Sequence, residues 1–191
     1  EERVAGGKLL EAAFGPSATE VFRSTEAVQI VACGTSYHAG AVAKYCIEQI
    51  ARIPCWVEIA SEYRYRNPVV PKNTLFVSIS QSGETADTLA ALRMAKKAGY
   101  LSTLAICNVP ESSLVRESDL VLLTRAGPEI GVASTKAFTT QLVALGMLVV
   151  ALAKCHGIDA ERERGLVHRL LEIPSLIEKT LHLDEKIGRA H

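Results

Sequence analysis

Five short apolar segments, each too short for a helix of ordinary length, recur along the 191 residues of this chain. Their content of Val, Ile, Leu and Phe is typical of buried β-strands. The predicted strands cover residues 28–33, 55–59, 75–79, 102–107 and 120–123. Because these segments are almost continuously apolar, both faces of the sheet must be covered. Helical segments between them, joined by right-handed crossovers, give an α/β fold: a doubly wound, five-stranded parallel sheet flanked by helices.

The segments between and around the strands define the remaining organisation. Helices are predicted over residues 18–24, 36–52, 85–98, 112–117 and 135–155. Residues 4–13 have a weak helical pattern that includes Gly6 and Gly7. Residues 160–183 are charged and helical, with an expected break at Pro174. We therefore divide the chain into a helical lead-in (1–26), the α/β domain (27–156) and a C-terminal helical extension (157–191).

The charge balance argues against two large classes of partner. The chain has 21 Lys plus Arg and 21 Asp plus Glu, so its formal net charge is zero. Nucleic acids and anionic membranes are bound mainly by clustered Lys and Arg, so we expect neither as a partner. A small anion remains compatible with a neutral chain, because backbone N–H groups at a helix N-terminus can hold it.

The spacing of cysteine and histidine gives no sign of a metal site. The five cysteines are far apart and form no C-x-x-C pair, which indicates reduced thiols. The histidines, at positions 38, 156, 168, 182 and 191, lack metal-ligand spacing. The longest apolar stretch, residues 142–153, is shorter than a bilayer span and indicates a core helix. No apolar signal segment opens the chain, so we expect a cytoplasmic protein without a metal or cofactor.

Three hydroxyl-rich turns follow predicted strands and precede predicted helices. They are Cys33-Gly-Thr-Ser36, Ser80-Gln-Ser-Gly-Glu-Thr85 and Gly131-Val-Ala-Ser-Thr135. In a doubly wound sheet, ligands bind outside the carboxyl ends of the strands, so these turns form the candidate site. Helix N-termini and neutral hydroxyl groups together favour a phosphate, and the hydroxyl groups of a sugar suit the same donors. The sequence therefore predicts a sugar-phosphate site.

An ordinary structural role competes with this interpretation, because Ser and Thr are common N-caps. One such turn alone would favour capping, whereas three at one sheet edge favour a binding site. Glu84 would repel a phosphate, so we expect its side chain to point aside. We expect Cys33 to be an inert thiol and His38 to lie on a helix surface, while Lys136 faces either the site or the outer side of its helix. The dinucleotide, P-loop, G-x-S-x-G and H-E-x-x-H motifs are absent.

The ordered motifs of the three turns resemble the sugar isomerase (SIS) domain. The resemblance rests on Cys33-Gly-Thr-Ser-Tyr37, Ser80-Gln-Ser-Gly-Glu-Thr-Ala-Asp87 and Glu129-Ile-Gly-Val-Ala-Ser-Thr-Lys-Ala-Phe138, with support from residues 58–62 and 104–108. It covers residues 27–153 and implies a flavodoxin-like three-layer sandwich. More narrowly, the motifs resemble the first of two SIS domains in the glutamine-dependent aminotransferase family that makes glucosamine 6-phosphate from fructose 6-phosphate.

The resemblance implies roles for individual residues of the turns. The phosphate of fructose 6-phosphate or glucosamine 6-phosphate would contact Ser36, Ser80, Gln81, Ser82 and Thr85. The sugar would contact Cys33, Gly34, Thr35, Val132 and Ser134.

The same resemblance implies an incomplete active site. In that family a glutaminase domain supplies a nucleophilic cysteine, and a second SIS domain and the C-terminal tail supply the proton-transfer groups and an imine-forming lysine. Neither set of motifs occurs here, so we expect no catalytic residue in this chain. The expected partners are a hexose 6-phosphate, those missing domains and a second copy in a homodimer. The alternatives are a stand-alone SIS-domain isomerase and a non-enzymatic regulator that senses a sugar phosphate.

Overall fold

A five-stranded parallel sheet forms the centre of the computed structural model, which describes residues 3–130 and 134–183. Its strands are β3 (Ala27–Ala32), β4 (Cys55–Ile59), β5 (Thr74–Ser80), β6 (Ser102–Cys107) and β7 (Leu120–Leu123). They lie in the order β4-β3-β5-β6-β7, and every neighbouring pair is parallel. All residues of β3, β5 and β6 are buried, which is why these segments read as continuous apolar runs. The predicted doubly wound α/β fold is confirmed.

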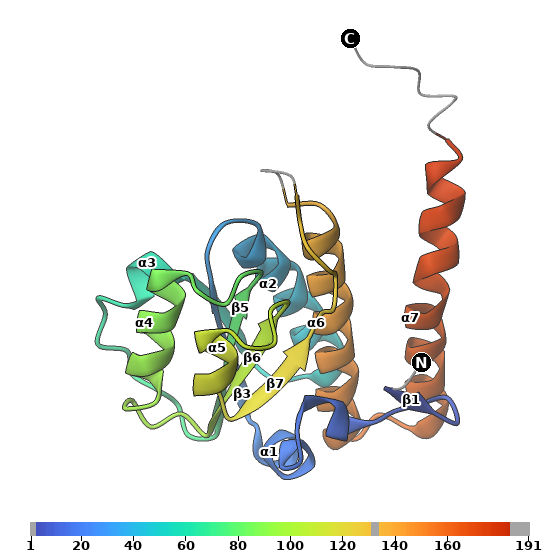
Figure 1. Cartoon of the computed structure of the whole chain (residues 1–191). Helices are drawn as coiled ribbons and strands as arrows, with labels where there is room; N and C mark the ends of the chain where they lie inside the picture. Colours follow the sequence, from blue (N-terminus) through green and yellow to red (C-terminus); the bar gives the residue numbers. More distant parts are fainter. Residues whose placement is uncertain (1–2, 131–133, 184–191) are drawn as a thin grey trace.

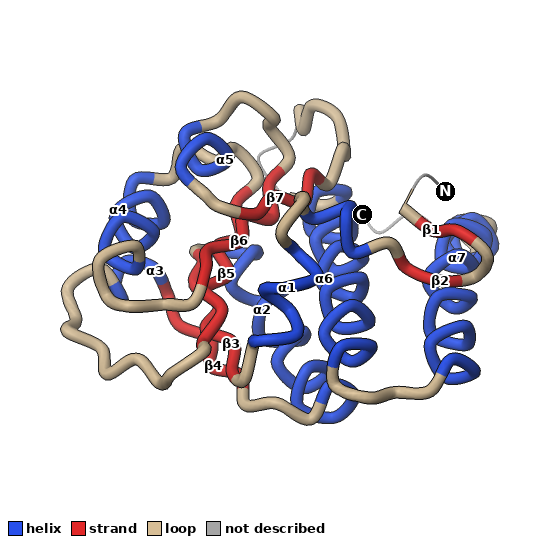
Figure 2. The backbone as a smooth tube through the Cα atoms, turned by 90° about the horizontal axis from the view of Figure 1, so that it is seen from below, coloured by secondary structure: helices blue, strands red, loops and turns tan. Residues whose placement is uncertain are grey.

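Helices cover both faces of the sheet, so the molecule has three layers (Figure 1). One face carries α1 (Ala18–Ser24), α2 (Gly34–Cys46), the π-helical turn η2 (Ile47–Ala51) and α6 (Lys136–Cys155). The other face carries α3 (Ala60–Tyr63), α4 (Ala86–Ala95) and α5 (Ser113–Glu117) (Figure 2). Each face has its own apolar cluster, so the core is divided by the sheet.

The N-terminal segment differs from the helix predicted over residues 4–13. It forms a short antiparallel hairpin of β1 (Val4–Ala5) and β2 (Lys8–Leu9), followed by the 3₁₀-helix η1 (Glu11–Phe14). The hairpin turn is Gly6-Gly7, with φ values of 56° and 72°. Two successive positive φ angles are what a two-residue hairpin turn of type I′ requires, and glycine adopts them without steric cost. The glycine pair therefore indicates a hairpin more strongly than the weak apolar spacing indicates a helix.

The C-terminal helix α7 (Ala160–Leu181) is continuous, so the break predicted at Pro174 is wrong. The proline removes only the hydrogen bond that its nitrogen would donate to the carbonyl of Leu170, and the surrounding turns retain theirs. Asp159 caps the start of the helix by accepting from the N–H of Arg162 at 2.7 Å. Val167 is buried against the core beside α6, whereas the second half of α7 extends past the sheet (Figure 1).

A small ionic cluster joins α7 to the rest of the molecule. The ammonium group of Lys154 lies 2.8 Å from a carboxylate oxygen of Glu11 and 3.5 Å from one of Glu163. It also donates to the carbonyl of Leu9 at 3.1 Å, and the N–H of Leu9 donates to Glu163 at 3.3 Å. Burial alone lowers the pKa of Lys154, but its pairing with Glu11 and Glu163 outweighs that effect and raises the pKa. One charged group thus connects α6, α7 and the N-terminal hairpin.

Helix α6 is apolar along most of its length. In the part of the chain that the structure describes, it is the one helix long and apolar enough to cross a membrane by length and composition. However, 56% of its apolar window is buried inside the molecule, and Ala144, Leu145 and residues 147–153 belong to the core cluster that also includes residues of α1 and α2. The helix is therefore accounted for as a core helix, as the sequence predicts.

Candidate functional site

The turns that follow β3 and β5 are neighbours at one edge of the sheet. The two strands pair in parallel, with Ala32 opposite Ile79, so both chains leave the sheet at the same edge. From β3 the chain first passes to β4 on one side and then crosses to β5 on the other. This reversal of strand order is the switch point at which doubly wound sheets bind their ligands.

The turn after β3 leads directly into α2. Cys33 is the N-cap residue, and Gly34, Thr35 and Ser36 form the first turn of the helix. No side chain caps this N-terminus, and no acidic residue lies in the first turn. Gly34 and Thr35 are exposed, whereas Ser36 is buried. The first backbone N–H groups of α2 therefore keep the partial positive charge of a helix N-terminus, as an anion requires.

The turn after β5 is held by its own hydroxyl groups. The hydroxyl oxygen of Ser80 accepts from the N–H of Gly83 at 3.0 Å and lies 3.4 Å from the hydroxyl oxygen of Thr85. The hydroxyl oxygen of Ser82 accepts from the N–H of Glu84 at 3.2 Å. Thr85 is the N-cap residue of α4 but makes no side-chain cap. The serine oxygens thus accept bonds that shape the turn. The proton of Ser82 is not used in these contacts, whereas Ser80 and Thr85 share one proton between their two hydroxyl groups.

Gly83 lets this turn lie directly against the end of β6. Its φ is +70°, in the left-handed region that favours glycine. A Cβ atom at this position would lie 2.1 Å from the hydroxyl oxygen of Ser112 and 2.8 Å from the sulfur of Cys107. The backbone of the turn continues this contact, because the carbonyl of Gln81 accepts from the N–H of Asn108 at 3.3 Å.

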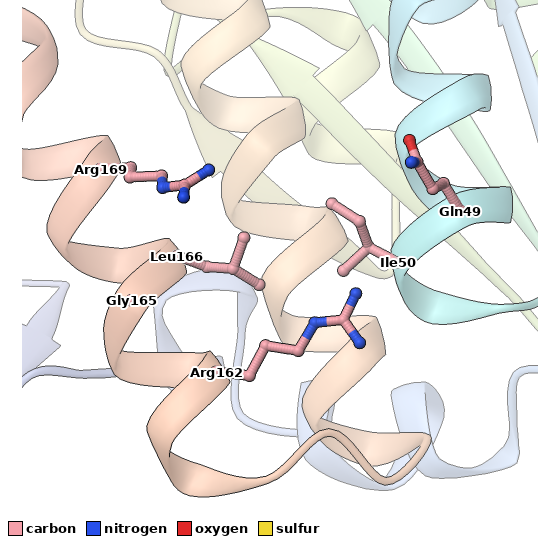
Figure 3. Close-up of a pocket in the computed structure, with 6 residues that line it drawn as sticks. All are labelled: Gln49, Ile50, Arg162, Gly165, Leu166 and Arg169. Carbon is pink, nitrogen blue, oxygen red and sulfur yellow. The ribbon is translucent and has the colours of Figure 1, made fainter.

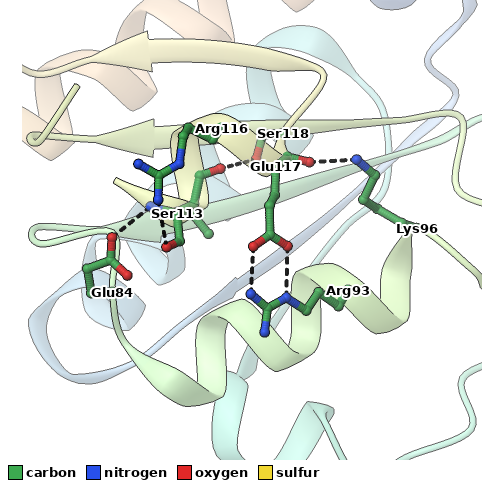
Figure 4. A network of polar contacts seen from close by, with 8 residues as sticks. Glu84, Arg93, Lys96, Ser113, Arg116, Glu117 and Ser118 are labelled. Atoms are coloured by element: carbon green, nitrogen blue, oxygen red, sulfur yellow. Dashed lines mark hydrogen bonds and ion pairs between the residues drawn. The ribbon is translucent and has the colours of Figure 1, made fainter. Parts of the chain in front are cut away.

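The Glu84 side chain points away from the candidate site, as predicted. Its carboxylate accepts from the N–H of Ser113 at 2.7 Å, at the start of α5 (Figure 4). The hydrogen bond from the Ser113 N–H lowers the pKa of Glu84, with a further contribution from Arg116. Arg93 and Glu117 form a second, bidentate pair between α4 and α5, at 2.6 and 2.8 Å. The carboxylate of Glu84 is therefore hydrogen-bonded to the start of α5 and does not repel an anion at the turn.

Two side chains that the sequence interpretation did not single out hold the loop between β7 and α6. Asn108 accepts from the N–H of Ala126 at 2.7 Å and donates to the carbonyl of Gly127 at 2.8 Å. Glu129 accepts from the N–H groups of Thr135 at 3.2 Å and Ala137 at 3.0 Å. The hydrogen bond from the Thr135 N–H, helped by that from Ala137, lowers the pKa of Glu129.

The Glu129 contacts change the expectation for the third turn. Its carboxylate accepts from the N–H groups of Thr135 and Ala137 at the start of α6, so these two donors are not free for a ligand. Ser134 is half-buried just before α6, and Lys136 is exposed as its first residue. Val132 lies outside the described residues. His38 is exposed on α2, with its ring 5.4 Å from that of Tyr37, as expected of a surface position.

Helix α6 nevertheless reaches the site through Gln141. This side chain lies in the second turn of the helix and donates to the hydroxyl oxygen of Ser36 at 3.0 Å. Both residues are buried, and they are 105 positions apart in the sequence. The contact brings α6 beside the first turn of α2, although β7 and β3 are separated by two strands.

The cysteines and acidic residues offer no metal centre within residues 3–130 and 134–183, where no three candidate ligands gather. All five cysteines are free, and Cys33 is half-buried beside the apolar cluster of α3 and α4. Burial, together with Glu48, raises the pKa of Cys55 to about 12, so this thiol stays protonated.

A separate hollow of about 450 Å³ lies between α7 and η2 (Figure 3). Arg162, Leu166 and Arg169 line it from α7, and Gln49 and Ile50 line it from η2. Because η2 follows the C-terminal end of α2, this hollow lies away from the Cys33–Ser36 turn. It is not part of the candidate site.

The sequence of the chain is similar to one protein-family model and to several characterised enzymes. A family model described as the SIS domain matches residues 22–151. The glutamine–fructose-6-phosphate aminotransferase (isomerizing) of Pseudomonas putida is 60% identical over 190 residues, which cover 99% of this chain and 31% of that protein. The enzyme of the same name from Escherichia coli K12 is 57% identical, over 97% of this chain and 30% of that protein. The chain thus spans about a third of the length of these relatives.

Solved structures agree with the fold. The C-terminal domain of glucosamine-fructose-6-phosphate aminotransferase from Francisella tularensis superposes with a TM-score of 0.94 and 53% identity, over 97% of this chain and 52% of that one. Glucosamine-6-phosphate deaminase from Thermotoga maritima superposes with a TM-score of 0.65 and 28% identity, over 78% of this chain and 48% of that one.

Proposed function

The chain belongs to the SIS domain family, and we propose that it binds a hexose 6-phosphate at the turns that follow β3 and β5. The observation that carries this proposal is the pair of neighbouring helix N-termini at the switch point of the sheet. Neither α2 nor α4 has a side-chain cap at its N-terminus. The acidic residue in the first turn of α4, Asp87, is paired with Arg64 at 2.6 Å. An anion at this edge would therefore meet helix dipoles without an unpaired carboxylate.

We assign the phosphate to donors on both turns. Ser82 and the hydroxyl pair of Ser80 and Thr85, which has one proton left to donate, lie on one side. Ser36 presents its proton from the other side, with the backbone and side chain of Gln81 between them. The absence of Lys and Arg among these residues is consistent with the zero net charge of the chain. Hydroxyl groups and backbone dipoles act at short range, so they hold a phosphate without a basic surface.

We assign the sugar to the residues beside the phosphate donors. Cys33, Gly34 and Thr35 would line one side of the sugar, and Val132 and Ser134 the other. The exposed positions of Gly34 and Thr35 support the first part of this assignment. Both relatives named above are called glutamine–fructose-6-phosphate aminotransferases, which makes fructose 6-phosphate and its amino-sugar product the natural ligands to test.

We propose further that the chain is the sugar-binding part of such an aminotransferase and does not turn over its ligand alone. Its length, about a third of the relatives, supports this part of the proposal. A glutaminase domain and a second SIS domain would supply ammonia and the groups that move protons. The proposal includes a cytoplasmic homodimer, for which Val42 and Tyr45 in the C-terminal half of α2 offer exposed apolar side chains.

A titration tests the binding proposal. Fructose 6-phosphate and glucosamine 6-phosphate added to the chain should shift the amide NMR signals of residues 33–36 and 80–85 before others. Ser82→Ala removes one hydroxyl donor to the phosphate and should raise the Kd about tenfold. Ser175→Ala, on the exposed part of α7, is the matched control and should leave the Kd unchanged.

Two outcomes would contradict the proposal. Signal changes at other residues, or no change at millimolar ligand, would exclude the site. Conversion of an aldose phosphate into a ketose phosphate by the chain alone would instead support a stand-alone isomerase.

A further inference from the structure

Gln141 is a polar side chain in an apolar setting. It lies on α6, whose other buried residues are all apolar, and only 2% of its surface is exposed. Burial of an amide in such surroundings costs free energy unless both its donor and its acceptor are satisfied. Its N–H donates to the hydroxyl oxygen of Ser36 at 3.0 Å. Its carbonyl oxygen, in contrast, has no hydrogen-bond partner in the part of the chain that the structure describes.

Folding alone gives no reason for a half-satisfied amide at this position. An apolar side chain of similar volume would fill the same space and would leave no buried acceptor without a partner. The contact that distinguishes Gln141 from such a side chain is the single hydrogen bond to Ser36. The role of Gln141 therefore depends on Ser36, which lies in the first turn of α2.

The direction of that hydrogen bond determines what Ser36 can do. A serine hydroxyl carries one proton and can accept other bonds at its oxygen. Because Gln141 donates to the Ser36 oxygen, the Ser36 proton is not used in this contact. No acceptor for that proton is found among the described residues. The Ser36 proton can therefore be donated to a ligand, at a helix N-terminus that favours an anion. The reverse orientation of the amide would draw the proton inward and remove this donor.

We propose that Gln141 is a positioning residue of the phosphate site, which keeps the Ser36 hydroxyl oriented as a donor to the bound phosphate. This inference rests on the proposed function and deepens it. It makes the orientation of one phosphate donor depend on a side chain of α6 that lies in the second turn of that helix. It also explains why a polar residue interrupts the buried face of this helix.

The test replaces Gln141 in the full 191-residue chain and measures the binding of fructose 6-phosphate by calorimetry. Gln141→Met keeps the volume and removes the donor, so the Kd should rise about tenfold, while the unfolding temperature stays equal or rises slightly. Gln141→Glu has the same shape but only accepts hydrogen bonds when ionised, so it should draw in the Ser36 proton and weaken binding at least as much.

A double-mutant cycle separates positioning from general support of the fold. In a Ser36→Ala background the hydroxyl is absent, so Gln141→Met should have no further effect on the Kd. A Kd unchanged by Gln141→Met, or an equal loss in the Ser36→Ala background, would overturn this inference while leaving the proposed function intact. Absence of binding by the unchanged chain would overturn the proposed function and this inference together.

Discussion

At the scale of single residues, Gly83 has two separate reasons to be glycine. Its positive φ disfavours any side chain, and a Cβ atom would also overlap Ser112. We expect Gly83→Ala to lower the free energy of unfolding by about 3 kcal/mol, the sum of a left-handed backbone cost and an overpacking cost. Gly99, at φ +85° with no atom within 4 Å of an added Cβ, separates the two contributions.

The control is therefore Gly99→Ala, which should cost about 1 kcal/mol from the backbone alone. Denaturant unfolding of both variants measures the difference. Equal losses would show that the turn moves away from β6 at no cost, against the packing described here. If the losses differ as expected, fructose 6-phosphate should also bind the Gly83→Ala chain more weakly, because its turn is displaced.

Single residues also show where prediction from sequence ends. The Ser80–Thr85 turn was predictable, because its density of donors and its place after a strand are local properties. Gln141 was not, because its importance comes from a contact with Ser36 across 105 positions. Asn108 and Glu129 lie within motifs that carry the family resemblance, but their hydrogen bonds depend on how two loops meet in space.

At the scale of elements, the start of α6 depends on a carboxylate from the preceding loop. Glu129 accepts N–H groups from the first turn, and this lowers its pKa in the folded chain. A lowered pKa contributes stability above the pKa of the unfolded chain, and this stability is lost as the pH falls through the folded value. Glu129→Gln should therefore lower the unfolding temperature near neutral pH and increase hydrogen exchange in the first turn of α6.

The pH dependence distinguishes this capping role from packing. The difference between the parent chain and Glu129→Gln should shrink as the pH falls through the lowered pKa of Glu129 in the folded chain, where the carboxylate becomes protonated. Glu178→Gln, on the exposed half of α7, serves as control and should show no difference near neutral pH. A constant difference between Glu129→Gln and the parent chain across this range would assign the effect to something other than charge.

The helices and strands differ in how far the local sequence determines their structure. All five central strands were predictable from the sequence. A strand that is buried on both faces is apolar at almost every position, whereas a short helix with one exposed face would also carry polar residues. The hairpin at Gly6-Gly7 differs from the helix predicted there, because two strands of two residues each are too short to show an alternating apolar pattern. The continuity of α7 through Pro174 was not predictable, because the sequence shows the hydrogen bond that the proline loses but not that the residues on both sides stay helical.

At the scale of the whole molecule, Lys154 is the point where three distant segments meet. The Glu163 side chain is only 5% exposed, so it depends on the ammonium group beside it. We expect Lys154→Met to lower the free energy of unfolding by about 2 kcal/mol, less than for a fully buried pair because Lys154 is partly exposed. Thermal or denaturant unfolding measures the loss.

A second variant identifies the cause. Glu163→Gln in the Lys154→Met background removes the unpaired buried charge and should restore part of the stability. Lys179→Met, on the exposed half of α7, should change stability by less than about 0.5 kcal/mol. If the double variant is less stable than Lys154→Met alone, the carboxylate is not the source of the loss.

The hydrogen bond between Ser36 and Gln141 also has a consequence for folding. It joins residues 105 positions apart, and β4, β5, β6 and β7 all lie between them in the sequence. Parallel sheets assembled from such long-range pairings form slowly compared with local structure. A ligand that binds more tightly when this bond is present therefore favours molecules in which α2 and α6 have packed together. Its stabilising effect falls on the entire domain, so binding reports the fully folded population rather than local order at one turn.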